Sequence, residues 1–117
     1  MKSFSIIIPV KEINDYLRES VPYLMGLDYE YFEILIVPNI EPSSLESVFI
    51  NDRLKIITSG AVSPAIKRDM GAKQAKFEYL AFLDDDAYPP SEWLQVANKT
   101  FSDKNVVAIG GPGVTPP

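Results

Sequence analysis

The sequence predicts an α/β fold built on a mainly parallel sheet. Short apolar runs, typical of buried strands, alternate with longer mixed segments that carry helix signals. Strands that are apolar on both faces favour a parallel sheet, in which helical crossovers join one strand to the next. The chain has 117 residues, of which 46% are hydrophobic and 23% charged, an ordinary globular balance. It is therefore one small domain or a piece of a larger one.

Two strands and a helix are predicted in the first third of the chain. Residues 4–10 (FSIIIPV) and 32–37 (FEILIV) are continuous apolar runs rich in β-branched side chains, so each predicts a strand buried on both faces. Between them, Asn14 is positioned to cap a helix that ends near Gly26. Pro22 lies inside this helix and is expected to kink or restart it.

The middle of the chain predicts a short helix, a strand and a longer helix. The short helix covers residues 43–49, and the third strand covers residues 54–58. The longer helix begins at Ser63-Pro64, a hydroxyl cap followed by proline in the first turn, and runs to about Lys76. The side chains expected along its apolar side are Ile66, Met70, the stem of Lys73 and Phe77.

The last third predicts two more strands and one more helix. Residues 79–83 (YLAFL) form the fourth strand, and a helix follows from Pro90 or Ser91 to Phe101. Residues 106–109 form a fifth strand. The final GGPGVTPP has the composition of a chain leaving the sheet, which predicts that the domain is truncated.

The composition excludes several kinds of chemistry. The chain has no cysteine and no histidine, so disulfides, zinc–thiolate sites and thiol nucleophiles are absent, and acid–base or metal chemistry must use carboxylates. Such oxygen ligands suit magnesium or manganese. A net charge of −5 argues against nucleic acid as a partner. The first apolar run is too short for a signal peptide or a membrane span, which fits a cytoplasmic protein.

An acidic run is the strongest functional signal. Asp84, Asp85 and Asp86 directly follow the predicted fourth strand, and ligands of open α/β sheets bind beyond the carboxyl ends of strands. Adjacent carboxylates repel one another, and a divalent cation removes that repulsion. The alternative is a helix cap or a solvated turn, but Pro89 and Pro90 move the next helix start beyond the capping reach of the first two acids.

Two cations form a second candidate feature. Lys67 and Arg68 lie in the first turns of the predicted Ser63-Pro64 helix, where a positive charge is unfavourable unless an anion such as phosphate is near. The equally weighted alternative is a solvated basic face whose charges pair with Asp69 or Glu78.

Two strand-end loops complete the candidate set. Val10, Lys11 and Glu12 follow the first strand, and Pro38 and Asn39 follow the second. In doubly wound sheets such loops line a nucleotide crevice. Each position taken alone is better explained as an ordinary turn residue.

Three segments resemble the N-terminal half of family 2 glycosyltransferases. They are SIIIPVKEINDYLRES, FEILIVPN and SPAIKRDMGAKQAKFEYLAFLDDDAYPPSEWL, and the stretch from Pro64 to Leu94 is the most specific. These inverting enzymes have the GT-A fold, a three-layer α/β/α arrangement, and use a nucleotide-sugar donor with a divalent metal. The resemblance implies that residues 1–117 are the donor-binding portion of such a domain.

The resemblance also implies roles for single residues. The acidic run matches the family's Asp-x-Asp motif, which gives Asp86 the contact to Mn or Mg and places Asp84 and Asp85 near the ribose or the waters of the metal. Residues 9–12 match the loop that holds the base, and Arg68 matches a basic position near the nucleotide. Together with the cations and loops above, the candidate donor-binding residues are Pro9, Val10, Lys11, Glu12, Asn39, Lys67, Arg68, Asp84 and Asp85, and the candidate metal ligands are Asp86 and Asp84.

The chain departs from the family pattern at two positions. Lys11 stands where the family usually has an aromatic residue, and Pro38-Asn39 stands where it usually has an acid that binds the base. The identity of the nucleotide therefore stays open.

The resemblance leaves the acceptor side unassigned. In the family, the general base and the acceptor-binding surface lie in a region that here falls beyond Pro117, so we expect the fragment to be weakly active or inactive alone. The acceptor is a sugar, a lipid-linked molecule or a protein. A membrane, at its cytoplasmic face, would be reached only through that missing part.

Two other classes of protein remain as alternatives. One is a non-catalytic nucleotide-binding or interaction module with the same sheet. The other is a phosphotransfer receiver-like domain, which also gathers acids at strand ends but needs an acidic pair after the first strand.

Overall fold

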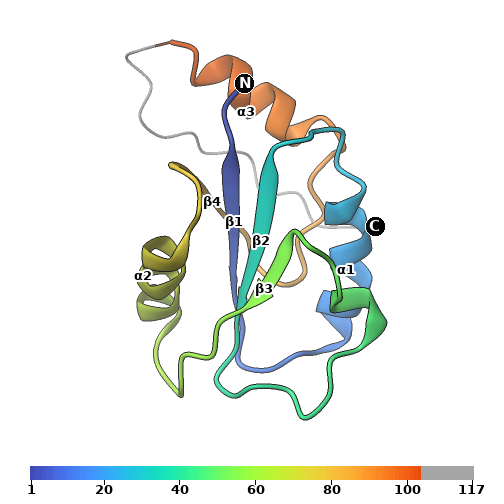
Figure 1. The fold of residues 1–117 in the computed structure, drawn as a ribbon, viewed down its shortest axis with the longest axis vertical. Coiled ribbons are helices and arrows are strands. Elements are labelled where there is room, and N and C mark those ends of the chain that lie inside the picture. The colour runs from blue at the N-terminus through green and yellow to red at the C-terminus, as the bar shows by residue number, and fades with distance from the viewer. Residues whose placement is uncertain (104–117) are drawn as a thin grey trace.

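The computed structural model describes residues 1–103, and Figure 1 shows their course. The predicted strand at residues 106–109 and the final GGPGVTPP lie outside the described residues. The elements are, in chain order, β1 (Phe4–Pro9), α1 (Asp15–Met25), β2 (Phe32–Val37), a 3₁₀ turn η1 (Ser47–Phe49), β3 (Leu54–Ile56), α2 (Pro64–Gln74), β4 (Tyr79–Phe82) and α3 (Trp93–Thr100).

The sheet has four strands in the order β3-β2-β1-β4, and every neighbouring pair is parallel. Phe4 lies opposite Phe32 on one side and Tyr79 on the other, so the three longest strands start level with one another. Their carboxyl ends consequently meet at one edge of the sheet. The predicted α/β fold with a parallel sheet is confirmed.

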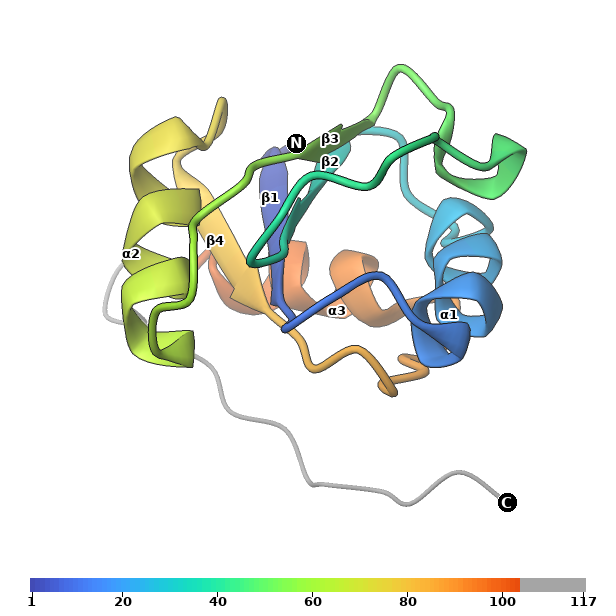
Figure 2. The same cartoon turned by 90° about the horizontal axis from the view of Figure 1, so that it is seen from below.

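Helices cover both faces of this sheet, which gives three layers (Figures 1 and 2). One face packs Ile6, Ile8 and Ile34 against Leu17 of α1 and Leu94 of α3. The other face is smaller: buried Ile7, Leu35 and Val37 pack against Ala72 and Ala75 at the end of α2. Burial on both faces explains why β1 and β2 are continuous apolar runs.

The packing of α2 differs from the prediction. Ile66, expected on the apolar side, is 48% exposed, whereas Lys67 and Gly71 are the buried residues of the helix. A Cβ atom added at Gly71 would lie 2.6 Å from Cγ2 of Ile7, so the glycine allows α2 to approach β1 closely. Small residues, rather than large apolar ones, therefore make this contact.

Three other helices also differ from the prediction in where they begin, break or end. Helix α1 continues through Pro22, which is exposed, and does not restart there. Helix α3 begins at Trp93, later than the predicted Pro90 or Ser91, after a turn in which Trp93 N donates to Pro90 O. Of the short helix predicted at 43–49, only the η1 turn forms.

The outer strands are shorter and more exposed than expected. Strand β3 ends at Ile56. Strand β4 alternates, with Leu80 and Phe82 exposed on the side where α2 covers β1 and β2. The acidic run thus follows a strand that, within residues 1–103, has one uncovered face.

A buried polar network attaches the start of β4 to the central strands. The Glu33 carboxylate accepts hydrogen bonds from Ser5 Oγ at 2.6 Å and from the backbone N–H of Lys76 at 2.6 Å. Ser5 Oγ accepts in turn from Phe77 N at 3.2 Å. These bonds fix where β4 begins and so fix where its acidic end emerges. No helix among residues 1–103 has the length and apolar character to cross a membrane.

Candidate functional site

A cavity of about 550 Å³ opens at the carboxyl ends of β1, β2 and β4, a volume typical of small-molecule sites. Its lining residues are Pro9, Val10, Lys11, Asn39, Ala61, Val62, Pro64, Lys67, Asp84, Asp85 and Asp86. The structure therefore brings together eight of the ten predicted donor-binding and metal residues. Glu12 and Arg68 are not part of this lining.

The acidic run leaves the sheet in a tight turn. Leu83 N donates to Ile7 O at 3.1 Å, which continues the strand pairing, and Ala87 N then donates to Asp84 O at 3.2 Å. The carboxylates of Asp84 and Asp86 are exposed and make no hydrogen bond or ion pair to any residue in the described range. Both are therefore available to a ligand.

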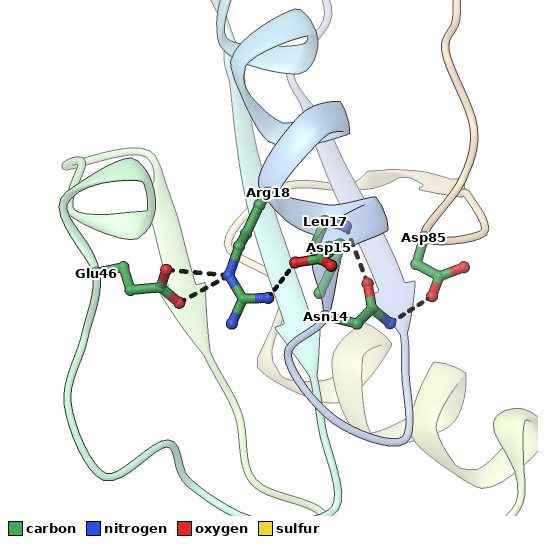
Figure 3. Close-up of polar contacts among 6 residues, drawn as sticks. All are labelled: Asn14, Asp15, Leu17, Arg18, Glu46 and Asp85. Atoms are coloured by element: carbon green, nitrogen blue, oxygen red, sulfur yellow. Dashed lines mark hydrogen bonds and ion pairs between the residues drawn. The ribbon is translucent and has the colours of Figure 1, made fainter.

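Asp85 is held by α1. Its Oδ2 accepts a hydrogen bond of 2.7 Å from Asn14 Nδ2, and its backbone carbonyl accepts one of 2.9 Å from Ser20 Oγ. Asn14 Oδ1 meanwhile accepts from Leu17 N at 3.0 Å, which is the predicted helix cap (Figure 3). One side chain thus starts α1 and fixes the acidic turn. The sequence indicated only the capping role.

A second polar contact steadies the other side of α1. Arg18 donates to Asp15 at 2.7 Å and to Glu46 at 3.0 Å, which joins α1 to the segment before η1 (Figure 3). The hydrogen bond to Glu46 raises the pKa of Arg18 above its usual value most, and the hydrogen bond to Asp15 raises it further. All three side chains are solvent-exposed, so the contact adds little stability.

The donor set is compatible with a hard divalent ion. Among residues 1–103, no group of three or more His, Cys, Asp or Glu side chains is arranged to hold a metal. Two free carboxylates, Asp84 and Asp86, do line the cavity. Magnesium characteristically binds one or two carboxylates and takes its other oxygens from water and substrate phosphates. The residues present fit that pattern.

Lys67 is a buried cation that also lines the cavity, at the carboxyl end of β2. It is 3% exposed, and its Nζ donates to Asn39 Oδ1 at 2.6 Å, Ser59 Oγ at 2.8 Å and Val37 O at 3.2 Å. Burial lowers its pKa below the usual value of a lysine. No carboxylate in the described chain forms an ion pair with Lys67. The alternative prediction, a solvated basic face paired with acidic residues, is therefore wrong for Lys67.

Backbone bonds join the strand-end loops that form the floor of the cavity. Asn39 N donates to Lys11 O at 3.0 Å, and Gly60 N donates to Asn39 O at 2.8 Å. Ser59 N donates to Pro38 O at 3.0 Å. Gly60 has a φ of +81°, a conformation that favours glycine, so it allows the loop after β3 to turn back toward Asn39.

Sequence reasoning missed several residues of the site. Ala61, Val62 and Pro64 line the cavity, and Ser59 and Asn14 hold residues that line it. The Ser63-Pro64 helix start could have predicted the lining by Pro64. In a parallel sheet, a helix that follows a strand begins at the carboxyl edge, where the cavity lies. The contact of Asn14 with Asp85 joins residues 71 positions apart, and neither it nor the contact of Ser59 with Lys67 had a sequence signal.

Curated relatives match most of the chain but extend well beyond it. An uncharacterized glycosyltransferase of Rickettsia felis is 28% identical over 107 residues, which are 88% of this chain and 18% of the relative. Glycosyltransferase AglE of Haloferax volcanii is 26% identical, with 92% and 38% covered. A relative of another description, the small ribosomal subunit biogenesis GTPase RsgA of Mycoplasmopsis agalactiae, is 26% identical, with 86% and 36% covered. The chain therefore spans well under half of each.

Solved structures share the fold. The crystal structure of S. aureus TarS 1-349 has a TM-score of 0.71 and 24% identity, and covers 95% of this chain and 38% of its own. Its complex with UDP-GlcNAc has the same TM-score at 22% identity, with 95% and 37% covered. The GT-A arrangement predicted for this chain is confirmed by this likeness.

The family assignment rests on a match that covers nearly the whole chain, including the cavity. The profile of the family described as glycosyl transferase family 2 matches residues 5–116, which includes all but the first residue of the elements described above and every residue that lines the cavity. A fold of this kind alone would leave the function open, because one fold serves many activities. With the fold, the cavity and the profile in agreement, the chain belongs to glycosyl transferase family 2.

Proposed function

We propose that residues 1–117 are the donor-binding part of a glycosyltransferase that moves a sugar from a nucleotide-sugar to an acceptor. The observation that carries this proposal is the cavity, which is lined by two free carboxylates, Asp84 and Asp86, and by a buried cation, Lys67. Family membership supports glycosyl transfer as the reaction. The TarS structure with UDP-GlcNAc supports a nucleotide-sugar as the donor.

In this proposal, Asp84 and Asp86 hold a magnesium or manganese ion. Such an ion neutralises the negative charge of the diphosphate as it leaves the sugar. The chain's own contribution is placement: Asp85, fixed by Asn14, sets the turn from which the two free carboxylates project. The other residues of the donor site are Pro9, Val10, Lys11 and Asn39 on the nucleoside side.

The finer parts of the proposal concern the rest of the reaction. Transfer proceeds with inversion, as in the family that the sequence resembles, and the general base and the acceptor site lie outside this chain. The acceptor is a sugar, a lipid-linked molecule or a protein. We place the protein in the cytoplasm as part of this proposal, as the sequence analysis expects.

Titration calorimetry with UDP, GDP, dTDP and CDP, with and without manganese, tests the donor site. We expect at least one nucleotide to bind only when the metal is present. Asp86→Asn should weaken that binding at least about tenfold, because a ligand of the metal is lost. Asp52→Asn is the matched control, since Asp52 is exposed and outside the cavity.

Two results would contradict the proposal. One is an Asp86→Asn variant that binds metal and nucleotide as tightly as the parent chain. The other is the absence of metal-dependent binding for every nucleotide. A protein that binds nucleotide without transferring sugar is the non-catalytic alternative, and it is recognised by lack of donor turnover in the whole protein.

A further inference from the structure

The loop that carries the acidic run is attached to α1 at two residues. Asn14 donates to the Asp85 carboxylate at 2.7 Å, and the hydroxyl of Ser20, which is 1% exposed, donates to the Asp85 carbonyl at 2.9 Å. The second attachment is made by Tyr88, whose hydroxyl donates to the Glu19 carboxylate at 3.2 Å. Asp85 and Tyr88 thus hold the loop on the same helix.

Tyr88 is held by its ring as well as by its hydroxyl. The rings of Tyr88 and Tyr23 meet edge to face, with centroids 5.2 Å apart and planes at 86°, an arrangement that aromatic pairs prefer. Pro89 and Pro90 follow directly, and their fixed φ angles stiffen the chain beyond the contact. The residue before a proline is itself restricted to extended backbone. Tyr88, which is half-buried, therefore ends the loop on α1 in a stiff segment.

Asp86 lies between the two attachments and has no contact of its own. Its carboxylate is exposed and forms no hydrogen bond or ion pair within residues 1–103, although it lines the cavity. The direction in which it points is therefore set by the backbone on either side. Asp85 fixes the preceding residue, and Tyr88 fixes the chain two residues later. Loss of the second attachment frees backbone torsion angles after Asp85.

We infer that Tyr88 is a positioning residue for Asp86, through its hydrogen bond to Glu19 and its ring contact with Tyr23. This inference rests on the proposed function, in which Asp86 holds the metal. When the attachment is lost, only a fraction of the molecules keep Asp86 in place at the cavity. The apparent dissociation constant of the metal then rises by the inverse of that fraction, whereas the metal-loaded site is unchanged.

The test separates the metal requirement from the nucleotide affinity. Whichever of UDP, GDP, dTDP and CDP binds the chain most tightly is titrated at a series of manganese concentrations. The series gives the affinity at saturating manganese and the manganese concentration at which half of that affinity is reached. For Tyr88→Ala we expect this half-saturating concentration to rise at least about threefold, as it does when about one molecule in three keeps Asp86 in place. The affinity at saturating manganese should stay within about twofold of that of the parent chain.

Further variants isolate the hydrogen bond between Tyr88 and Glu19. Tyr88→Phe keeps the ring contact and should raise the half-saturating concentration less than Tyr88→Ala does. Glu19→Gln removes the charge but keeps an acceptor, so it should behave as the parent chain does, whereas Glu19→Ala should match Tyr88→Phe. The Tyr88→Phe, Glu19→Ala double variant should be no worse than either single one, because both remove the same bond.

Tyr16→Phe is the matched control. Tyr16 is another exposed tyrosine of α1, and its hydroxyl has no partner within residues 1–103, so the half-saturating concentration should not change. Misfolded molecules lower the number of binding sites per chain in the same titration, which distinguishes a folding defect from a raised metal requirement.

The outcomes distinguish this inference from the proposed function. A Tyr88→Ala variant with the half-saturating manganese concentration of the parent chain overturns the inference and leaves the donor site intact. Additive effects of Tyr88→Phe and Glu19→Ala overturn it as well, because they show that the two side chains act separately. Failure of all four nucleotides to bind the parent chain overturns the proposed function itself, and the inference falls with it.

Discussion

Asn14 shows how much one side chain contributes at the residue scale. Its amide oxygen caps α1, and its amide nitrogen holds Asp85, so it uses both ends of the amide in two different elements. Loss of a helix cap typically lowers the free energy of unfolding by about 1 kcal/mol. The contact with a half-exposed carboxylate contributes less, because water can replace the lost partner.

Two substitutions at Asn14 separate these contributions. Asn14→Ala should lower the free energy of unfolding by about 1–2 kcal/mol, because the cap and the Asp85 contact are both lost. Asn14→Ser keeps a capping oxygen and should lower it by less than about 0.5 kcal/mol. Urea denaturation of the three proteins measures the difference. Equal losses in both variants would mean that the Asp85 contact, rather than the cap, dominates.

Lys67 makes the free energy of unfolding depend on pH, and the direction of its pKa shift sets the sign of that dependence. Burial lowers its pKa in the folded chain below the value of 10.5 that an unperturbed lysine has, so the unfolded chain binds this proton more tightly. Stability contributed by Lys67 therefore rises as the pH increases from the folded pKa toward 10.5. We expect the free energy of unfolding of the parent chain, relative to Lys67→Met, to increase between pH 7 and pH 10.

The comparison with Lys67→Met is needed because Tyr29 changes the free energy of unfolding with pH in the opposite direction. Burial raises the pKa of Tyr29, so its contribution is lost as the pH rises through about 10. Both proteins contain Tyr29, and the difference between them removes its effect. A difference that stays flat or falls with pH would contradict the buried ammonium described for Lys67.

At the scale of elements, Gly71 controls how closely α2 packs on the sheet. A Cβ at this position would lie 2.6 Å from Cγ2 and 3.2 Å from Cγ1 of buried Ile7, so the Ile7 side chain, the strand or the helix must shift. Overpacking of this kind costs about 1–3 kcal/mol, more than the gain of up to about 1 kcal/mol from alanine in a helix. Gly71→Ala should therefore be destabilising.

Thermal or urea unfolding measures this effect, with Gly26→Ala as the control. A Cβ at Gly26 meets only ordinary contacts at 3.5 Å, and its φ is −87°, so that variant should stay within about 1 kcal/mol of the parent. Because α2 also carries Lys67, Gly71→Ala should weaken nucleotide binding as well. A Gly71→Ala variant as stable as the parent would show that α2 has room to move.

Helix faces are where sequence reasoning failed in this chain. The pattern at Ile66 and Met70 indicated an apolar side, but α2 meets the sheet through Gly71 and Ala75 and buries the stem of Lys67. Residue hydrophobicity carries no information about how close two backbones come. The helix also does not restart at Pro22, because a helix packed through Leu17 and Val21 tolerates a proline on its exposed side.

At the scale of the molecule, the parallel topology assembles the site. Each crossover returns the chain to the same end of the sheet, so residues after β1, β2 and β4 meet around one cavity although they are far apart in sequence. The buried network of Glu33 and Ser5 and the contact of Asn14 with Asp85 then fix the last of these loops. Position in the site thus depends on long-range contacts.

The sequence by itself determined the four strands of residues 1–103, their parallel sheet and most of the cavity lining, because apolar periodicity, caps and prolines act over a few neighbouring residues. Only the tertiary structure decided that Lys67 is buried without an ion-pair partner in the described chain, that Asn39 accepts a hydrogen bond from it, and that Asp85 is bound to α1. The physical reason is that hydrogen-bond partners and close backbone approaches join residues distant in sequence, and no local pattern encodes them.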